Sequence, residues 1–225
     1  MAIDTSDFTF QGVGFVHNSG IPGCMDPLAT NYDANATIDD GSCTQAGFTY
    51  IPDANFRTKL EDDYGPFTWK YFTITSEYVL TSDINSILVL DIAAGSWGNV
   101  SDLTGLEDFA ALTELYIDSN GSILSIPLVN ANGNANHPNL KLLDFDSCNS
   151  IVAIDVSKNL MLEILVTSSG QLTSLDVSNN TALTVLDCRN NQLTSLDVRN
   201  GNNTNFTYFS STGNPNLDCI EVDDV

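Results

Sequence analysis

Oxygen-bearing side chains alternate along an acidic stretch near the start of the chain, at every second residue. The candidate ligands among them are Asn31, Asp33, Asn35 and Asp39, with Thr37 between the last two. Carboxylate and amide oxygens bind calcium in proteins, so this spacing could surround a calcium ion. The EF-hand pattern does not fit, because Ala36 and Ser42 stand where that loop needs glycine and a bidentate glutamate. A solvated loop of Asx turns is the alternative interpretation.

The reactive side chains do not form a catalytic pattern. A cysteine nucleophile needs a base, and the histidines are His17 and His137, neither in a metal-ligand spacing. We find no nucleophile elbow, P-loop or dinucleotide fingerprint. With 29 acidic residues, pairs of carboxylates are expected by chance, so such a pair is no evidence of an acid–base site. The sequence therefore predicts a protein that is not an enzyme.

The charge balance excludes several classes of partner. The 225 residues carry 29 acidic and 7 basic side chains, a net charge of −22. A surface this negative repels nucleic acid and anionic lipid, and suits divalent cations or a basic partner. No run of 18 apolar residues predicts a membrane span, and MAIDTSDFTFQGVGF lacks the regions of a secretory signal.

The chain repeats itself with a period of 21 residues. LTSLDV occurs at Leu172–Val177 and again at Leu193–Val198. The aliphatic residue in the middle of this motif recurs every 21 positions, at Ile154, Leu175, Leu196 and Leu217. A second line reads Leu183-x-x-Leu186-x-Cys188-x-x-Asn191-x-Leu193. A fixed period near 20 indicates a solenoid whose turns stack their apolar residues on one another. We expect parallel strands near Leu115, Leu143, Leu165, Leu186 and Phe209. We also expect the side chains of Leu175, Leu196 and Leu217 to stack in one column across successive turns.

These turns resemble the short leucine-rich repeats of surface proteins from marine Bacteroidetes. The resemblance covers residues 84–225, and YIPDANFRTKLEDDYG, within residues 47–83, resembles the helical cap that precedes such arrays. We expect a helix over Pro52–Tyr64 that ends at Gly65-Pro66. The resemblance implies a β-rich solenoid, a right-handed coil with a parallel sheet, and a role in binding or adhesion.

Residues 21–46 resemble a different unit, the short Cys-bounded acidic modules related in style to thrombospondin type 3 repeats. The stretch GCMDPLATNYDANATIDDGSC carries this likeness, which implies a disulfide between Cys24 and Cys43. Closing the 18-residue loop would contribute about 3 kcal/mol. The remaining cysteines are Cys148, Cys188 and Cys219. They fall at inward positions of the repeat or at the position that Asn191 holds, and they are expected to be buried.

Two surfaces are candidates for binding a partner. The outward strand positions predict a ligand-binding face made of Tyr116, Leu142, Asp144, Ile164, Val166, Val185, Asp187, Arg189 and Tyr208. The alternative is that β-branched residues at these positions simply suit strands. Residues 1–20 are strand-like over Asp7–Val16, with Phe8, Phe10, Val13 and Phe15, and are expected to dock on a partner chain.

The sequence favours a surface-displayed recognition or adhesion protein, extracellular or on a cell surface, which binds a protein or a glycan. The alternative is a structural or receptor-facing virion protein of a phage that infects such bacteria. The lack of an export signal and a start at Met1 favour the virion interpretation, whereas the resemblance to surface proteins favours the first.

Overall fold

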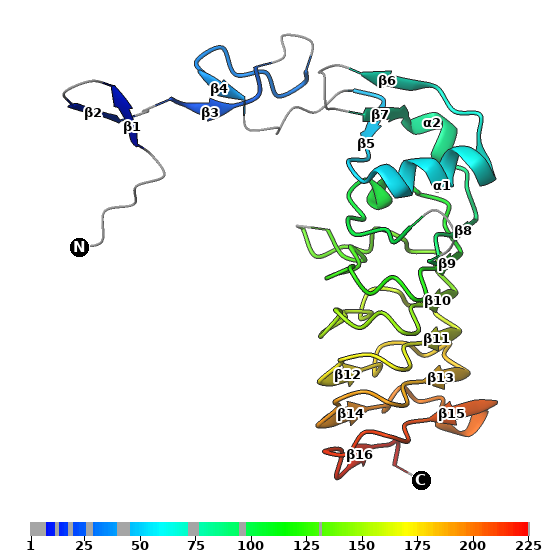
Figure 1. The fold of residues 1–225 in the computed structure, drawn as a ribbon. Coiled ribbons are helices and arrows are strands. Elements are labelled where there is room, and N and C mark those ends of the chain that lie inside the picture. The colour runs from blue at the N-terminus through cyan, green and yellow to red at the C-terminus, as the bar shows by residue number, and fades with distance from the viewer. Residues whose placement is uncertain are drawn as a thin grey trace. The chain divides into compact units, whose positions relative to one another are not determined.

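The computed structural model describes residues 8–11, 14–17, 20–25, 29–39, 46–71, 77–94, 98–130 and 132–224. The chain divides into two compact units, residues 1–48 and 49–225, which are described separately (Figure 1). None of the helices in the described part of the chain has the length and apolar character that a membrane span requires.

The first unit contains short strand pairs. The segment predicted to be strand-like contains two antiparallel strands, β1 (Phe8–Gln11) and β2 (Gly14–His17), while Val13 lies outside the described residues. In the following module, β3 (Pro22–Gly23) pairs with β4 (Ile38–Asp39) in parallel. The backbone N–H of Asp33 donates to the carbonyl of Cys24 at 2.9 Å, which fixes the loop between these two strands.

A small cap opens the second unit. It contains a three-stranded sheet and two helices: β5 (Phe48–Tyr50), α1 (Ala54–Tyr64), β6 (Trp69–Tyr71), β7 (Glu77–Leu80) and α2 (Thr81–Ile84), with the sheet order β5-β7-β6. Helix α1 buries Phe56 and Leu60, as its spacing predicts, and ends at Gly65. It begins after Pro52, because Asp53 is the N-cap and accepts hydrogen bonds from the N–H groups two and three residues on.

Asp53 also joins the cap to the first turn of the solenoid. Its second carboxylate oxygen accepts hydrogen bonds from the Ser101 backbone N–H at 2.8 Å and the Ser101 hydroxyl at 2.9 Å. Burial pushes the pKa of this carboxyl up, but the hydrogen bonds from Phe56, Ser101 and Asp102 outweigh it and leave the pKa below its ordinary value. One side chain therefore fixes both the helix start and its docking.

The solenoid carries a six-stranded parallel sheet along one side (Figure 1). Its strands, in spatial order, are β8 (Val89–Asp91), β9 (Glu114–Tyr116), β10 (Leu142–Asp144), β11 (Ile164–Val166), β13 (Val185–Asp187) and β15 (Tyr208–Ser210). The middle residue of each strand is in register with that of the next, from Leu90 through Leu115 to Phe209. The predicted leucine-rich-repeat solenoid is confirmed, and each predicted strand position is occupied.

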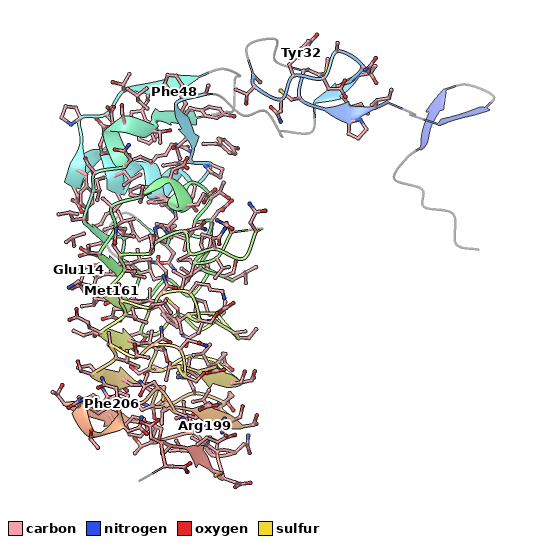
Figure 2. The ribbon with its side chains drawn as sticks, turned by 180° about the vertical axis from the view of Figure 1, so that it is seen from behind. Tyr32, Phe48, Glu114, Met161, Arg199 and Phe206 are labelled. Carbon is pink, nitrogen blue, oxygen red and sulfur yellow. The ribbon has the colours of Figure 1, made fainter. Side chains whose placement is uncertain are left out.

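A second, three-stranded parallel sheet runs along the other side of the coil (Figure 1). Its strands are β12 (Ser174–Asp176), β14 (Ser195–Asp197) and β16 (Ile220–Glu221). Leu175 pairs with Leu196 as expected, but Leu196 pairs with Ile220. The expectation that Leu217 continues this column is wrong, because extra residues in the last turn shift the register from 21 to 24. Arg199 lies near the C-terminal end of the coil (Figure 2). Its guanidinium links β14 to β16 through ion pairs with Asp197 at 2.5 Å and Glu221 at 2.6 Å.

Buried asparagine side chains connect successive turns below the first sheet. Asn191 Oδ1 accepts from the Leu172 N–H at 3.0 Å, and its Nδ2 donates to the carbonyls of Thr167 at 2.7 Å and Cys188 at 3.2 Å. We call this the ladder position; in other turns it is held by Asn120, Cys148, Gly170 and Asn214. A side chain with both a donor and an acceptor satisfies backbone groups that the chain cannot pair where it leaves the strand.

The residue before each ladder position has a left-handed backbone. The φ angles are 57° at Ser119, 58° at Ser147, 56° at Ser169, 54° at Asn190 and 75° at Gly213. A Cβ on Gly213 would lie 2.2 Å from Asn190 Oδ1, so the last position needs glycine for space as well as for conformation. Small polar residues tolerate this region best, which explains why Ser, Asn and Gly occupy it.

Aspartates at the strand ends close the corners of the coil. Asp144, Asp176 and Asp197 each accept a hydrogen bond from the backbone N–H two residues on, at 3.1, 2.8 and 3.0 Å. Asp91, Asp155 and Asp187 make the same bond. This is the Asx turn, which fixes the direction of the chain as it leaves a strand. The Asp that follows each leucine in the repeat therefore has a structural role.

One continuous hydrophobic core runs from Ile51 in the cap to Val198 in the solenoid. Cys148 and Cys188 lie in it, as expected, but Cys219 is exposed. The shifted register places Ile220, and not Leu217, opposite Leu196, so Cys219, the residue before Ile220, takes an outward position. Phe209 is 40% exposed although it continues the inward column, because no further turn covers it among the described residues.

The core predicts that the second unit folds without the first. None of its clustered residues precedes Ile51. We therefore expect a fragment of residues 49–225 to unfold in one cooperative transition at a temperature close to that of the full chain, as measured by circular dichroism. Loss of the cooperative transition in this fragment would mean that residues 1–48 contribute to the core.

Candidate recognition face

The outward residues of the six-stranded sheet lie in columns that follow the strand register. The first column contains Val89, Glu114, Leu142, Ile164, Val185 and Tyr208, and the second contains Asp91, Tyr116, Asp144, Val166, Asp187 and Ser210. Eight of the nine residues expected to form the ligand-binding face fall in these columns, and Arg189 lies two residues beyond Asp187. The sheet thus brings the nine residues to one side of the coil.

Apolar side chains form the central part of the first column. Leu142, Ile164 and Val185 are partly buried and pair with one another across adjacent strands, while Tyr208 at the end of the column is 43% exposed. Adjacent strands are about 4.8 Å apart, so these side chains contact their neighbours and make a narrow apolar strip.

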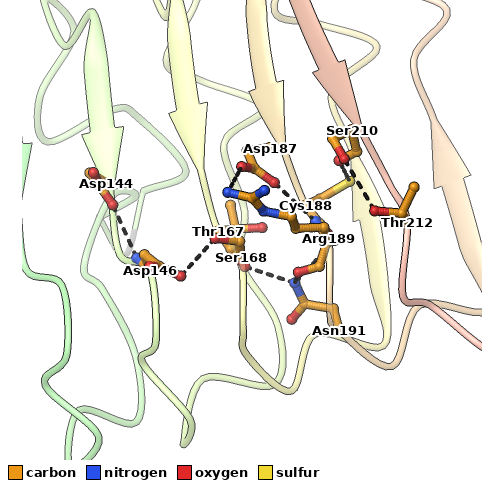
Figure 3. A network of polar contacts seen from close by, with 10 residues as sticks. All are labelled: Asp144, Asp146, Thr167, Ser168, Asp187, Cys188, Arg189, Asn191, Ser210 and Thr212. Carbon is orange, nitrogen blue, oxygen red and sulfur yellow. Dashed lines mark hydrogen bonds and ion pairs between the residues drawn. The ribbon is translucent and has the colours of Figure 1, made fainter.

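Asp187 is more enclosed than its outward position predicts. The residue is only 6% exposed, and its carboxylate pairs with the Arg189 guanidinium at 3.0 Å (Figure 3). The arginine side chain remains half exposed, so it covers the aspartate and presents the cation to solvent. The face therefore offers Arg189 at this point, and Asp187 acts by holding it in place.

Carboxylates dominate the other half of the face. Ser168 Oγ donates to Asp146 Oδ1 at 2.7 Å, and the Tyr116 hydroxyl donates to Glu114 Oε2 at 2.9 Å (Figure 3 shows the first of these). Burial raises the pKa of Asp118, with further contributions from Asp91 and Asp146. Burial likewise raises the pKa of Asp144, together with its carboxylate neighbours. These like charges destabilise one another, so a cation that approached this half would be attracted.

Glu114, Asp118 and Asp146 lie on the same side of the coil but are not among the nine residues predicted for the face. Glu114 lies in the first column, and Asp118 and Asp146 lie two residues beyond Tyr116 and Asp144 of the second column. The 21-residue spacing alone could have found them, because every outward position follows from the phase of the inward leucines. They were omitted because acidic residues are so abundant in this chain that one more carboxylate carries little signal.

The candidate calcium ligands lie in the first unit. Asp33 Oδ1 accepts hydrogen bonds from the Asn35 backbone N–H at 2.8 Å and from Asn35 Nδ2 at 3.2 Å, while the Thr37 hydroxyl accepts from the Ile21 N–H at 2.8 Å. These are bonds of an Asx-turn loop. No group of three His, Cys, Asp or Glu side chains suited to a metal occurs in the described part of the chain. Calcium binding stays a prediction, which is checked by whether EDTA lowers the melting temperature.

The cysteines differ in accessibility and in ionisation. Cys24 is buried and disulfide-bonded, while Cys43, its expected partner, lies outside the described residues. Burial raises the pKa of Cys148 to about 11 and that of Cys188 to about 12, so neither thiol forms an appreciable thiolate at neutral pH. Both are therefore unreactive structural residues.

Alkylation should separate these thiols. We expect iodoacetamide at pH 8 to modify Cys219 in the native protein, because this thiol alone among the three free ones is exposed. After unfolding without a reductant, Cys148 and Cys188 should react as well, giving three modified cysteines by mass spectrometry. Modification of a fourth or fifth cysteine would contradict the predicted bridge between Cys24 and Cys43.

His137 has no catalytic setting. Its side chain is fully buried, and Nδ1 lies 3.3 Å from the carbonyl oxygen of Phe109. Burial lowers the pKa of this imidazole, so it is neutral at physiological pH. His137 belongs to the core beneath the loop that lengthens one turn, where it cannot reach a substrate.

Comparison with known proteins adds the fold class. No protein-family model matches the sequence, and no curated protein matches it. Among solved structures, the chain is similar to the functional domain of InlJ from Listeria monocytogenes, which includes a cysteine ladder, with 24% identity and a TM-score of 0.59. That match covers 76% of this chain and 34% of the other, so the chain spans about a third of the length of that structure.

Two further similar structures are internalins from the same organism. InlF matches with 17% identity and a TM-score of 0.40, over 64% of this chain and 49% of the other. Internalin C2 matches with 15% identity and a TM-score of 0.39, over 78% of this chain and 79% of the other. Likeness at these identities concerns the fold alone. The parallel sheets of the chain and its likeness to the InlJ domain together identify the leucine-rich-repeat solenoid fold.

Proposed function

We propose that this chain is a non-enzymatic recognition module that binds a protein partner across the outward face of its six-stranded sheet. The observation that carries the proposal is the apolar strip of Leu142, Ile164 and Val185 beside a row of carboxylates and one cation. Apolar anchors within a charged rim are the composition of protein interfaces. The apolar strip would stabilise the strands without charged residues beside it, whereas a protein partner would contact both the strip and the charges.

The partner expected from this surface carries basic side chains. Lys141 is paired with Glu163 at 2.9 Å and Arg189 with Asp187, whereas Asp118, Asp144 and Asp146 have no cation within ion-pair distance among the described residues. A partner with lysine or arginine opposite these carboxylates would relieve their repulsion and would associate faster at low salt.

The test uses matched charge insertions on the two sheets. Partners are captured on the immobilised full chain, purified, and measured by biolayer interferometry. Ile164→Glu should weaken binding at least tenfold, because it places a carboxylate in the centre of the strip. Ser195→Glu, on the outward side of the second sheet, is the control and should bind as the natural chain does. Equal losses in both variants, or none in Ile164→Glu, would contradict the proposed face.

We further propose surface display. The resemblance of residues 84–225 to bacterial surface repeats supports an extracellular or cell-surface location, with the β1–β2 hairpin of residues 1–20 docking on a partner chain. Antibodies against residues 84–225 should label intact cells of the source. Labelling of virions in place of cells would favour the phage interpretation. Deleting residues 1–20 should abolish attachment while leaving the solenoid folded.

A further inference from the structure

A polar cavity lies on the solenoid outside the recognition face. Its volume is about 380 Å³, and it opens between two loops of successive turns, residues 102–107 and 125–136. The lining residues used below are Asp102, Leu103, Glu107, Pro127, Asn130 and Asn136. Pockets for small ligands begin at roughly this volume, which suits one or two sugar rings.

An enlarged turn builds one wall of the cavity. Leu115 and Leu143 are 28 residues apart, whereas the next inward residues, Leu143, Leu165 and Leu186, follow at 22 and 21. The extra residues lie in the loop around Asn130–Asn136. Repeats that only stack need no such addition, so the insertion has the form of a binding loop carried on a rigid scaffold.

Hydrogen bonds hold the enlarged loop in one conformation. Asn130 Oδ1 accepts from the N–H groups of Asn132 at 2.9 Å and Asn134 at 3.1 Å, and Asn136 Nδ2 donates to the Pro127 carbonyl at 2.7 Å. A β-bridge between Val129 and Ala135 closes the loop. The wall is therefore formed before a ligand arrives, which lowers the entropy cost of binding.

Each carboxylate of the cavity has one oxygen fixed and one available. Asp102 Oδ1 accepts from the backbone N–H and the hydroxyl of Thr104, at 2.9 and 2.7 Å, and Glu107 Oε2 accepts from the Gly105 N–H at 3.0 Å. The other oxygens, Asp102 Oδ2 and Glu107 Oε1, have no hydrogen-bond partner among the described residues. Charged acceptors held in this way make strong, directional bonds to hydroxyl groups.

The lining selects against most classes of ligand. It contains no lysine, arginine or histidine, so phosphate and carboxylate groups would meet uncompensated negative charge. It contains no aromatic ring on which a nucleobase could stack. Carboxylate, amide and hydroxyl groups beside the apolar surfaces of Leu103 and Pro127 fit a neutral molecule rich in hydroxyl groups and with one less polar side.

We propose that the cavity between residues 102–107 and 125–136 binds a neutral saccharide, independently of the protein-binding face. Sugar hydroxyls donate to Asp102 Oδ2 and Glu107 Oε1 and accept from Asn130 Nδ2, while the C–H side of the ring lies against Leu103 and Pro127. The chain would then hold two separate sites, one for a protein and one for a glycan.

The test screens the full chain against an array of neutral and acidic saccharides, with and without EDTA. The best-retained neutral sugar is then measured as the free compound by saturation-transfer difference NMR. Asp102→Asn and Glu107→Gln keep the acceptor oxygens that brace the loops but remove the charge, and each should weaken binding at least tenfold. Asn132→Ala, an exposed residue of the same loop whose backbone makes the bracing bond, is the control and should bind normally.

Four outcomes would overturn the proposal: retention of no neutral sugar, retention of acidic sugars only, equal binding by the carboxylate variants, and binding that EDTA abolishes, which would indicate a cation site. Melting temperatures of all variants exclude unfolding as the cause of a loss. Ile164→Glu should leave sugar binding intact, so failure of the protein-binding face and failure of the cavity are distinguishable.

Discussion

Asn191→Ala should lower the free energy of unfolding by about 3–5 kcal/mol, the largest effect expected from a polar substitution in this chain. The Asn191 side chain is fully buried and bonds to the N–H of Leu172 and the carbonyls of Thr167 and Cys188. Alanine leaves the Leu172 N–H and the Thr167 carbonyl buried without these partners, at a cost of about 1–3 kcal/mol for each, while the Cys188 carbonyl keeps its hydrogen bond from Asn214 Nδ2 at 3.0 Å. Chemical denaturation followed by circular dichroism measures the change.

Two further variants distinguish the loss of the Asn191 hydrogen bonds from the loss of an asparagine side chain in general. Asn179→Ala removes an exposed amide elsewhere in the repeat. Its free energy of unfolding should stay within about 0.5 kcal/mol of that of the natural chain. Asn191→Asp keeps an acceptor oxygen but loses the two donated bonds, so it should also be strongly destabilised. If Asn191→Ala behaves like Asn179→Ala, the ladder does not contribute to stability.

Leu165→Ala should cost about 2–5 kcal/mol. Leu165 is fully buried in the inward column, with Leu143 paired on one side and Leu186 on the other. Because turns above and below hold the backbone in register, the site cannot collapse around the missing methyl groups, and a cavity remains.

Phe209→Ala provides the comparison within the same column. Phe209 pairs with Leu186 on one side but is 40% exposed, so part of its surface is already in water and no closed cavity forms. Its cost should be smaller than that of Leu165→Ala, although the removed side chain is larger. A larger loss for Phe209→Ala, measured by the same denaturation experiment, would mean that the end of the coil limits its stability.

The first sheet could be predicted from sequence because its signal is both periodic and redundant. The inward position carries Leu in five consecutive turns, and the position four residues beyond the strand carries Asn120, Cys148 and Asn191, whose side chains bond to the backbone. Strand position, direction and outward columns all follow from that phase. The helix of the cap followed from the spacing of Phe56 and Leu60, but its start depended on which residue caps it.

The register of the last turn could not be predicted by extending the 21-residue period. Relative to the 21-residue period it contains two extra residues before Phe209 and one after Asn214, so Ile220 takes the place expected for Leu217. The extra residues form a 3-10 turn over Asn203–Asn205, which Asp223 holds through the N–H groups of Gly201 and Asn203. Such bonds between residues far apart in sequence have no periodic signal.

The recognition face was predicted as a set of outward positions but not as an electrostatic surface. The burial of Asp187 depends on the rotamer of Arg189, and the raised pKa of Asp144 depends on burial and on the carboxylates of Asp118, Asp146 and Asp187. The polar cavity arises where residues 102–107 meet residues 125–136, and the Asn-rich composition of the second loop predicts only a turn. These properties come from side chains that meet in space, which one sequence does not specify.

The variable length of the turns has a consequence for how such a protein acquires new specificity. The sheet registers stay aligned although the inward residues follow one another at intervals of 28, 22, 21 and 23. Insertions are therefore absorbed in the loops, without moving the neighbouring strands. New ligand sites can arise by insertion or deletion within a single turn, and a loop such as residues 125–136 should be exchangeable between turns as a cassette in protein engineering.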